Sequence, residues 1–561
     1  MKSFLKLIKN ELIKIFAQTS YKVLIAILLA IFIIIPIGIK GISSILNIGM
    51  SSFYSIEDDI ELYEELASNE FETELNREYY SVYADALKLY RDNNMDFNSW
   101  QYGTMFQSYL SLLVSERAYF LLSNGEITIE EIGESEFSYY IEFDADSSQY
   151  SEMYNYAHTE RIDYEKLILN AEISSFYDKY INDIKASASA DEEYLLALRL
   201  EAVEKPSEAL NLEIECVSKA LSAYNSLSAV FLHLKENNID TSNWKYSSAI
   251  LLDGLVYEIS SSASAVLTEE EFSKDIYSKE QYGTYQQYCE KTLRNVVEKH
   301  ETALAIEYSV KNNVPTQASQ ELSTKTVFRS SAMSSLTFIM YFAIVVSSLM
   351  ISSEFTSGTS RLLFIRPHKR NRILMSKYTT IICIIVALNI ASIIVSFLMS
   401  ILVNGAGDIF VADLIVNNGE VKRQNSILAF LGTLILANFR ILLVTTFTFM
   451  VASLTKKGAL SICLGLISEM VVSSVGSLIC SFAKISSTKF TMLPYYNMEI
   501  FSANQVEYHL SGNSIFTPNY VYQYSQAQEL SIFGGIANYA LWFGILLTIL
   551  LLIFKKQEIK N

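Results

Sequence analysis

The chain has few of the residues that interrupt helices or cross-link small domains. Its 561 residues include 20 glycines, 6 prolines and 5 cysteines. So little glycine and proline argues against a fold with many tight turns and favours long helices. Five cysteines do not make a disulfide framework, and whether Cys216 and Cys289 are bonded stays open.

Motifs of catalysis and nucleotide binding are also lacking. The sequence has no G-x-x-x-x-G-K-[ST], so it does not bind ATP through a P-loop. It has no HExxH, no GxSxG and no paired CxxC, and its 5 histidines are scattered. We therefore expect a protein that is not an enzyme and that holds neither a cofactor nor a metal ion in this chain.

The charges are unevenly distributed. The formal net charge is -18, which argues against nucleic acid as a partner. About 51 acidic residues against about 22 basic ones fall within residues 40–330. The rest of the chain is weakly basic, and half of all residues are hydrophobic. This contrast predicts two surroundings, water for the acidic part and a membrane for much of the remainder.

Apolar runs long enough to cross a bilayer predict a multi-pass protein of a bacterial cell membrane. Lysine and arginine gather between alternate runs, so both termini are expected in the cytoplasm. The first run could also be a cleaved signal peptide, but no small-x-small cleavage site follows it. The predicted spans are residues 21–39, 331–352, 378–403, 427–454, 459–482 and 532–554.

Residues 1–20 are basic and amphipathic. Phe4, Leu5, Ile8 and Leu12 recur at helical spacing, and lysines take the other positions. Such a helix suits the membrane interface, where lysines meet anionic lipid headgroups. The simpler alternative is a cytoplasmic leader to the first span.

Residues 40–330 predict a large extracytoplasmic helical domain with an internal repeat, at about 60–200 and 205–330. The sequence 92-DNNMD-96 followed by Trp100 matches 236-ENNID-240 followed by Trp244. Thr128-Ile129-Glu130-Glu131 also resembles Leu267-Thr268-Glu269-Glu270. We expect two copies of one helical unit.

The repeated turn has a direct physical interpretation. Asn-Asn would end a helix because asparagine tolerates the left-handed conformation. Asp96 or Asp240, or a following Ser, Thr or Asn, would cap the next helix, and the tryptophan would anchor it. The alternative is calcium, bound by oxygens of Asp92, Asn94, Asp96 and Asn98, but the glycine and the final glutamate of such a loop are missing.

A short basic segment, residues 353–377, joins the second and third spans. It contains six Lys or Arg and a single acid, Glu354, and Pro367 would end a short amphipathic helix within it. A basic loop of this kind belongs on the cytoplasmic side. Its interior is apolar at Leu362, Leu363 and Ile365.

This segment and the order of the spans resemble the permease subunit of type-2 ABC exporters. The resemblance implies that the loop is a coupling helix that docks into a separate ABC ATPase subunit, which would carry ATP and magnesium. It also implies a second permease chain, as a homodimer or heterodimer, in membrane lipid. The residues that carry the match, and the implied coupling role, are Glu354, Gly358, Thr359, Arg361, Leu363, Arg366, Pro367 and Arg370.

Two charged residues fall inside predicted spans. Arg440 lies near the middle of the fourth span and Glu469 near the middle of the fifth. Charges within a membrane usually face the bundle interior and pair. We expect an intramembrane polar pair that either fixes the packing of the two spans or lines a substrate path.

Residues 483–531 predict an extracytoplasmic loop whose tyrosines anchor in the interface. Taken together, the chain is expected to be an all-α membrane protein with six transmembrane helices and a large helical extracytoplasmic domain. As a permease it would move a peptide, lipid or other amphipathic substrate out of the cell. The alternative is a membrane-anchored receptor or immunity protein whose acidic insert binds extracellular antimicrobial peptides.

Overall fold

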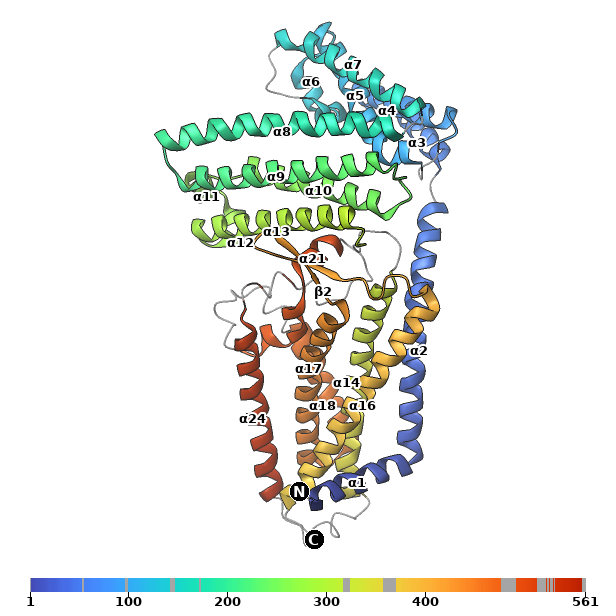
Figure 1. Ribbon diagram of the computed structural model, residues 1–561, viewed down its shortest axis with the longest axis vertical. Helices are drawn as coiled ribbons and strands as arrows, with labels where there is room; N and C mark the ends of the chain where they lie inside the picture. Colours follow the sequence, from blue (N-terminus) through green and yellow to red (C-terminus); the bar gives the residue numbers. More distant parts are fainter. Residues whose placement is uncertain are drawn as a thin grey trace. The chain divides into compact units, whose positions relative to one another are not determined.

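A computed structural model describes the chain as two compact units. Unit 1 comprises residues 1–43, 191–227 and 248–561, and unit 2 comprises residues 44–190 and 228–247. Each unit is mostly helical and is considered by itself (Figure 1). The described residues are 2–52, 55–95, 99–141, 147–170, 173–315, 323–356, 370–475, 491–511, 521, 524, 528 and 530–556.

Long apolar helices form the bundle of unit 1. Among the described residues, six helices are long and apolar enough to cross a membrane, which confirms the predicted fold class. They are α2 (Thr19–Ser52), α14 (Thr324–Thr356), α16 (Arg370–Asn404), α17 (Ser426–Thr455), α18 (Gly458–Met470, continued by a π-helical turn at Val471–Val475) and α24 (Ile532–Lys556). Helix α2 continues well past the predicted end of the first span at residue 39.

Small residues let α18 approach its neighbours. A Cβ atom added to Gly465 would lie 2.6 Å from Oγ1 of Thr448 on α17 and 2.9 Å from Ile344 on α14. One added to Gly458 would lie 2.7 Å from Oγ of Ser352. Close backbone approach at small residues is how helices gain contact where lipid offers no hydrophobic driving force.

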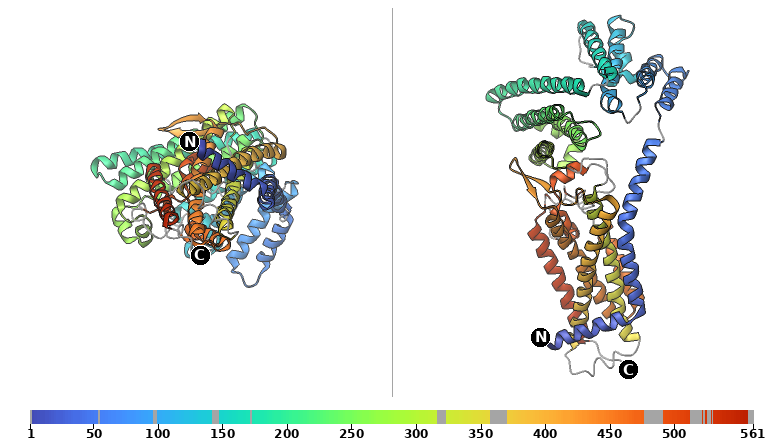
Figure 2. Two further views of the ribbon diagram at one scale, coloured as in Figure 1. Left: turned by 90° about the horizontal axis from the view of Figure 1, so that it is seen from below. Right: turned by 45° about the vertical axis from the view of Figure 1, so that its right-hand side comes forward.

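Helix α1 (Lys2–Ala17) crosses one end of the bundle (Figures 1 and 2). Leu7, Ile8 and Ile15 are buried, whereas Leu5 and Phe16 remain exposed. One apolar face thus packs on the bundle and apolar side chains remain outside it, as expected of a helix at a membrane interface. We call this end of the bundle the α1 end.

The opposite end carries a β-hairpin, an element that the sequence analysis did not predict. Strands β1 (Asp413–Asn417) and β2 (Glu420–Gln424) pair antiparallel, with Asn417 opposite Glu420. The two residues between them, Asn418 and Gly419, have φ of 53° and 78°. An Asn-Gly pair at positive φ is the favoured two-residue hairpin loop. We call this the hairpin end.

Short helices and α13 (Tyr285–Asn312) complete unit 1 at the hairpin end. Helix α13 contacts the hairpin, where Arg423 donates a hydrogen bond to the hydroxyl of Tyr308 at 3.1 Å. The other elements there are α11 (Glu269–Lys274), α12 (Ile276–Tyr282), η4 (Leu493–Tyr495), η5 (Met498–Ser502) and α21 (Gln505–Ser511). Of these, η5 contacts the spans α17 and α24, and α21 contacts α13 and β1.

Unit 2 is a separate helical assembly. It contains α3 (Ile56–Ser68), α4 (Glu74–Asp92), α5 (Trp100–Ser123), α6 (Ile129–Gly133), η1 (Glu136–Tyr140), η2 (Ser147–Gln149) and α7 (Tyr150–Asn170). Helices α8 (Ile173–Glu204), α9 (Glu208–Glu236) and α10 (Trp244–Ser264) each contribute residues to both units. The two units therefore divide the predicted insert at places other than its repeat boundaries.

Both copies of the repeated turn have the predicted backbone. Asn94 and Asn238 have φ of 54° and 46°, so each ends its helix in the left-handed region. The next amide returns to the helix in both copies, from Met95 to the carbonyl of Tyr90 and from Ile239 to that of Leu234. Asp96 and Asn98, two ligands of the calcium alternative, lie outside the described residues.

The helix that follows the first Asn-Asn turn, α5, begins with a side-chain cap, as predicted. The Ser99 side chain caps α5 by accepting from the amide of Tyr102 at 3.2 Å. Further along, Thr128 and Thr268 each form a capping box with the glutamate three residues later. Both stretches thus share the Asn-Asn turn and the capping box, and the repeat of residues 60–200 and 205–330 stays a prediction.

Candidate functional site

A buried ion network lies at the α1 end, beside the segment that joins α14 to α16. The ammonium of Lys377 donates to Glu11 Oε2 at 2.9 Å and also to Glu354. Lys14 completes the network at 3.3 Å from Glu11 and 3.7 Å from Glu354. Only 3% of the Lys377 side chain is exposed, so its charge depends on these carboxylates.

The network joins three elements that are distant in sequence. Glu11 belongs to α1, Glu354 to the last turn of α14 and Lys377 to the second turn of α16. Burial alone would raise the pKa of Glu11, but the attraction and hydrogen bonds of Lys377, with Lys14, leave that pKa below its usual value. Glu11 is therefore held as a carboxylate, and α1 is held against both helices that flank residues 357–369.

Most of the predicted coupling residues lie outside the described residues. These are Gly358, Thr359, Arg361, Leu363, Arg366 and Pro367, and of Arg370 only the backbone, at the start of α16, is described. Glu354 is the one whose side chain the structure places. Its part in the ion network was not foreseen, because nothing in a single sequence links Glu11 to residues more than 300 positions away.

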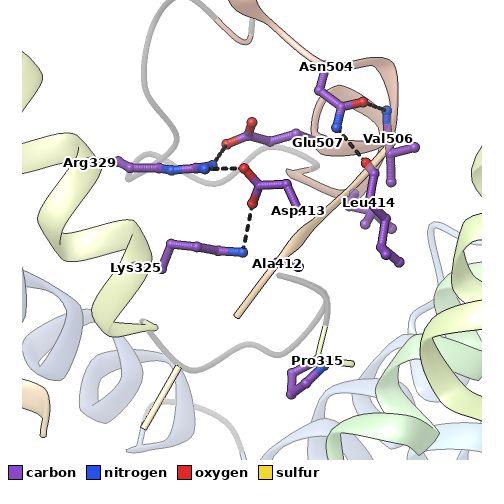
Figure 3. A pocket seen from close by; sticks show the side chains of 10 residues that line it. Pro315, Lys325, Arg329, Ala412, Asp413, Leu414, Asn504, Val506 and Glu507 are labelled. Atoms are coloured by element: carbon purple, nitrogen blue, oxygen red, sulfur yellow. Dashed lines mark hydrogen bonds and ion pairs between the residues drawn. The ribbon is translucent and has the colours of Figure 1, made fainter. Parts of the chain in front are cut away.

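A second buried ion network lies at the hairpin end (Figure 3). The two arms of the Arg329 guanidinium reach different acids, Glu507 at 2.9 Å and Asp413. The ammonium of Lys325 lies 3.0 Å from the other oxygen of Asp413, and Arg329 also donates to Ser426 Oγ at 3.0 Å. The network joins α14, β1, α17 and α21.

Burial and charge compete at Asp413. Burial alone would raise its pKa, but attraction to Arg329 and then to Lys325 leaves it below the usual value. Beside the network is a cavity of about 30 Å³, lined in part by Pro315 and Leu510. Asn504 closes it by donating to the carbonyl of Leu414 at 2.6 Å. This space suits a water molecule and is too small for an organic substrate.

A third polar cluster surrounds Arg440 within the bundle. The Arg440 guanidinium donates to Asn497 Oδ1 at 3.0 Å and lies 5.9 Å from the centre of the Tyr496 ring. In the part of the chain that the structure describes, no ion pair within 4.0 Å joins Arg440 to Glu469. Glu469 is buried and Arg440 is half-buried in this region, and Tyr496 lies close to each of them.

Glu499 is the unexpected member of this cluster. It is 5% exposed, and its Oε2 has no hydrogen-bond partner among the described residues, nor do Nε of Arg440 and the hydroxyl of Tyr496. Burial raises the pKa of Glu499, with Arg440 acting in the opposite direction. Burial, with the charges of Glu469 and Glu499, likewise raises the pKa of Tyr496 against the effect of Arg440. Such a group of unpaired buried atoms invites water or a polar ligand.

The placement of Tyr495 and Tyr496 corrects the expectation of interfacial anchors. Both are buried, and the carbonyl of Tyr496 accepts from the Tyr539 hydroxyl at 2.8 Å. The physical reason is that η4 and η5 pack against α17 and α24. Residues 491–502 have low mean hydropathy and do not resemble a span, so their sequence does not predict that Glu499 is buried.

These features define a multi-span helical membrane protein with buried ion networks at both ends of its bundle. Residues 297–559 match a family described as "Protein of unknown function (DUF2705)". A protein of Bacillus subtilis (strain 168), described as "Uncharacterized protein YhcI", is 29% identical over 164 residues, or 29% of this chain and 51% of the relative. The chain thus spans about half the length of this curated relative. No solved structure matches the chain.

Proposed function

We propose that this chain is the transmembrane permease subunit of an ATP-driven exporter of the ABC type. A separate ATPase would dock on residues 357–369 and supply ATP and magnesium. A second permease chain would complete the transporter. The α1 end would face the cytoplasm and the hairpin end the outside, in agreement with the distribution of basic residues.

The ion network at the α1 end is the observation that carries this proposal. A loop that receives mechanical work must be attached firmly to the helices that it moves. Lys377 ties Glu354, just before the loop, to its own position just after the loop. Glu11 adds α1 to the same network. A displacement of the loop would therefore move α1, α14 and α16 together.

The cluster around Arg440 supports a polar path through the bundle. Ionisable residues in a membrane are costly and usually mark a functional route. Unpaired polar atoms on Arg440, Tyr496 and Glu499 could receive the polar part of an amphipathic substrate. Their position between α17, α24 and residues 491–502 suits a segment that closes the outer side of the path.

Co-purification tests the proposal. Tagged chain would be isolated from its native membrane with the double change Leu363→Ala/Arg366→Glu and compared with wild type. We expect a P-loop ATPase to accompany the wild type and to be reduced at least tenfold by the double change. Lys422→Glu, an exposed charge reversal on the hairpin, serves as the matched control and should leave the association unchanged.

The same experiment can contradict the proposal. If the Leu363→Ala/Arg366→Glu variant retains the ATPase, the loop is not the site where the ATPase docks. If no ATPase accompanies the wild type and a bound extracellular peptide does, the chain is a receptor and not a permease. A folding control is the elution profile of each variant, which must match that of wild type.

A further inference from the structure

A large cavity in unit 1 lies between α13 and α21, apart from the three polar clusters. Its volume is about 700 Å³, within the range of sites for small organic ligands. Polar residues of α13 line one wall at the spacing of a single helix face. Those are Tyr288, Lys291, Thr292, Arg294, Asn295 and Glu298.

The opposite walls supply aromatic surface. Tyr282 of α12 and Tyr508 of α21 line the cavity with Tyr288. The rings of Tyr282 and Tyr288 meet edge to face with their centres 5.2 Å apart. The hydroxyl of Tyr288 accepts from the amide of Leu267 at 3.0 Å, which fixes that ring in place. A flat apolar group could lie on these rings.

The charges that line the cavity are mainly positive. Two cations, Lys291 and Arg294, face a single carboxylate, Glu298. That carboxylate is already engaged, because the side-chain amide of Gln528 donates to its two oxygens at 2.7 and 2.8 Å. Arg294 makes no ion pair within 4.0 Å with any residue that the structure describes, and its guanidinium fork suits a carboxylate or phosphate.

The positive charge of this lining contrasts with the acidic sequence around it. Residues 40–330, which supply α13, carry about 51 acids and about 22 bases. A guanidinium without an ion pair among the described residues, as at Arg294, is not what so acidic a composition predicts. Beside them, Nε2 of His509 is buried without a hydrogen-bond partner among the described residues. Burial lowers the pKa of this histidine to about 4, so its ring is neutral and does not add to the charge.

We propose that this cavity is a binding site for an amphipathic organic anion, a carboxylate or phosphate attached to a flat apolar body. Arg294 binds the anionic group, and the rings of Tyr282, Tyr288 and Tyr508 contact the apolar body. The proposal concerns binding alone and holds whether or not the chain transports anything.

Three probes that share one ring system test the assignment. Purified full-length chain in lipid nanodiscs would be titrated with 2-naphthoate, 2-naphthamide and 2-naphthylmethylammonium, with empty nanodiscs as the blank. We expect 2-naphthoate to bind at least tenfold more tightly than either analogue. Equal or tighter binding of the amide or the ammonium would overturn the proposal.

Variants of the lining locate the site. Arg294→Gln removes the charge and leaves a shorter polar side chain, and should weaken the binding of 2-naphthoate about tenfold. Glu298→Gln removes the repulsive charge and should tighten it severalfold. A purely structural role for these residues would not produce changes of opposite sign.

Lys311→Gln is the matched control. Lys311 lies on the same helix and pairs with Glu307 outside the cavity. Its removal should leave the affinity within twofold of wild type. If Lys311→Gln and Arg294→Gln weaken 2-naphthoate equally, the effect belongs to the general field of the helix and the proposed site is wrong.

Discussion

The two ends of the bundle hold their helices with different cations. At the hairpin end the central cation is Arg329, whose planar guanidinium reaches two acids and a hydroxyl at fixed angles. At the α1 end it is Lys377, a point charge on a flexible stem. Arginine favours a fixed arrangement, whereas lysine tolerates small changes in the positions of its partners.

The difference suits the two environments. The hairpin end joins four elements around Arg329, and the cavity directly beside that arginine has a volume of only about 30 Å³. The α1 end lies beside residues 357–369, where the proposed function requires movement. In both networks α14 takes part, with Lys325 and Arg329 near its start and Glu354 near its end. Helix α14 therefore takes part both in the fixed network around Arg329 and in the adjustable network around Lys377.

The largest effect is expected at the hairpin end. Arg329→Gln leaves Glu507 without its buried partner and Asp413 with Lys325 alone, which should cost about 3–5 kcal/mol of the free energy of unfolding. Thermal unfolding followed by fluorescence in detergent would measure it. Arg329→Lys should recover only part of the loss, since an ammonium cannot reproduce the fork.

Lys422→Gln is the control for that prediction. Lys422 pairs with Glu420 on the exposed hairpin, and such pairs are worth about 0–1 kcal/mol. Equal stability of Arg329→Gln and Lys422→Gln would show that the hairpin end is not clamped by Arg329.

The α1 end should be affected less. Lys377→Gln removes the buried ammonium that Glu11 and Glu354 share, and we expect a loss of about 2–3 kcal/mol. The double change Glu11→Gln/Lys377→Gln should recover about half, because one carboxylate then no longer lacks a partner. Lys377→Arg should stay within about 1 kcal/mol of wild type if this network is adjustable.

Additive losses in the two single variants and the double variant would contradict a shared network at the α1 end. A loss from Lys377→Arg as large as that from Arg329→Lys would contradict the contrast between the ends. Both outcomes come from the same thermal measurements, with the distant change Lys422→Gln again as reference.

The smallest effect is a difference in acid sensitivity. The pKa of Glu11 and that of Asp413 are both lowered in the folded protein, from ordinary values of 4.5 and 3.8. Their stabilisation is complete above those ordinary values and is lost as the pH falls toward the folded-state pKa, because only the unfolded carboxyl then binds a proton. The α1 end should therefore begin to weaken at higher pH than the hairpin end.

Paired unfolding curves between pH 7 and pH 3 measure this difference. The stability gap between wild type and Glu11→Gln should be constant down to about pH 5 and then shrink, on the order of 1 kcal/mol in all. The gap for Asp413→Asn should begin to shrink at lower pH. If the Asp413 gap shrinks first, the order of the two ends is wrong.

Local and periodic features were predictable from the sequence. Apolar runs indicated the spans, and the Asn-Asn turns indicated the left-handed residues Asn94 and Asn238. The hairpin could also have been found, because Asn418-Gly419 lies between two short alternating segments. Each of these signals is contained within a few consecutive residues.

Contacts between distant segments were not predictable. The sequence indicated that Arg440 and Glu469 face the bundle interior as a pair; Glu469 is buried and Arg440 is half-buried, but no ion pair within 4.0 Å joins them among the described residues. It did not indicate that Asn497 takes the hydrogen bond of Arg440, or that Glu499 lies buried nearby. Which polar group approaches a buried charge is decided by the packing of whole helices, and a single sequence holds no record of that packing.

The use of asparagine at helix ends and in the hairpin loop has a consequence for the unfolded chain. Four of the five non-glycine residues at positive φ among the described residues are asparagines, at 94, 238, 313 and 418. Glycine would reach the same backbone angles with less strain, yet it would also give the denatured chain more freedom to lose on folding. With asparagine in place of glycine, the chain loses less conformational entropy when these turns form. The helices can therefore end at defined residues without adding flexibility to the denatured chain.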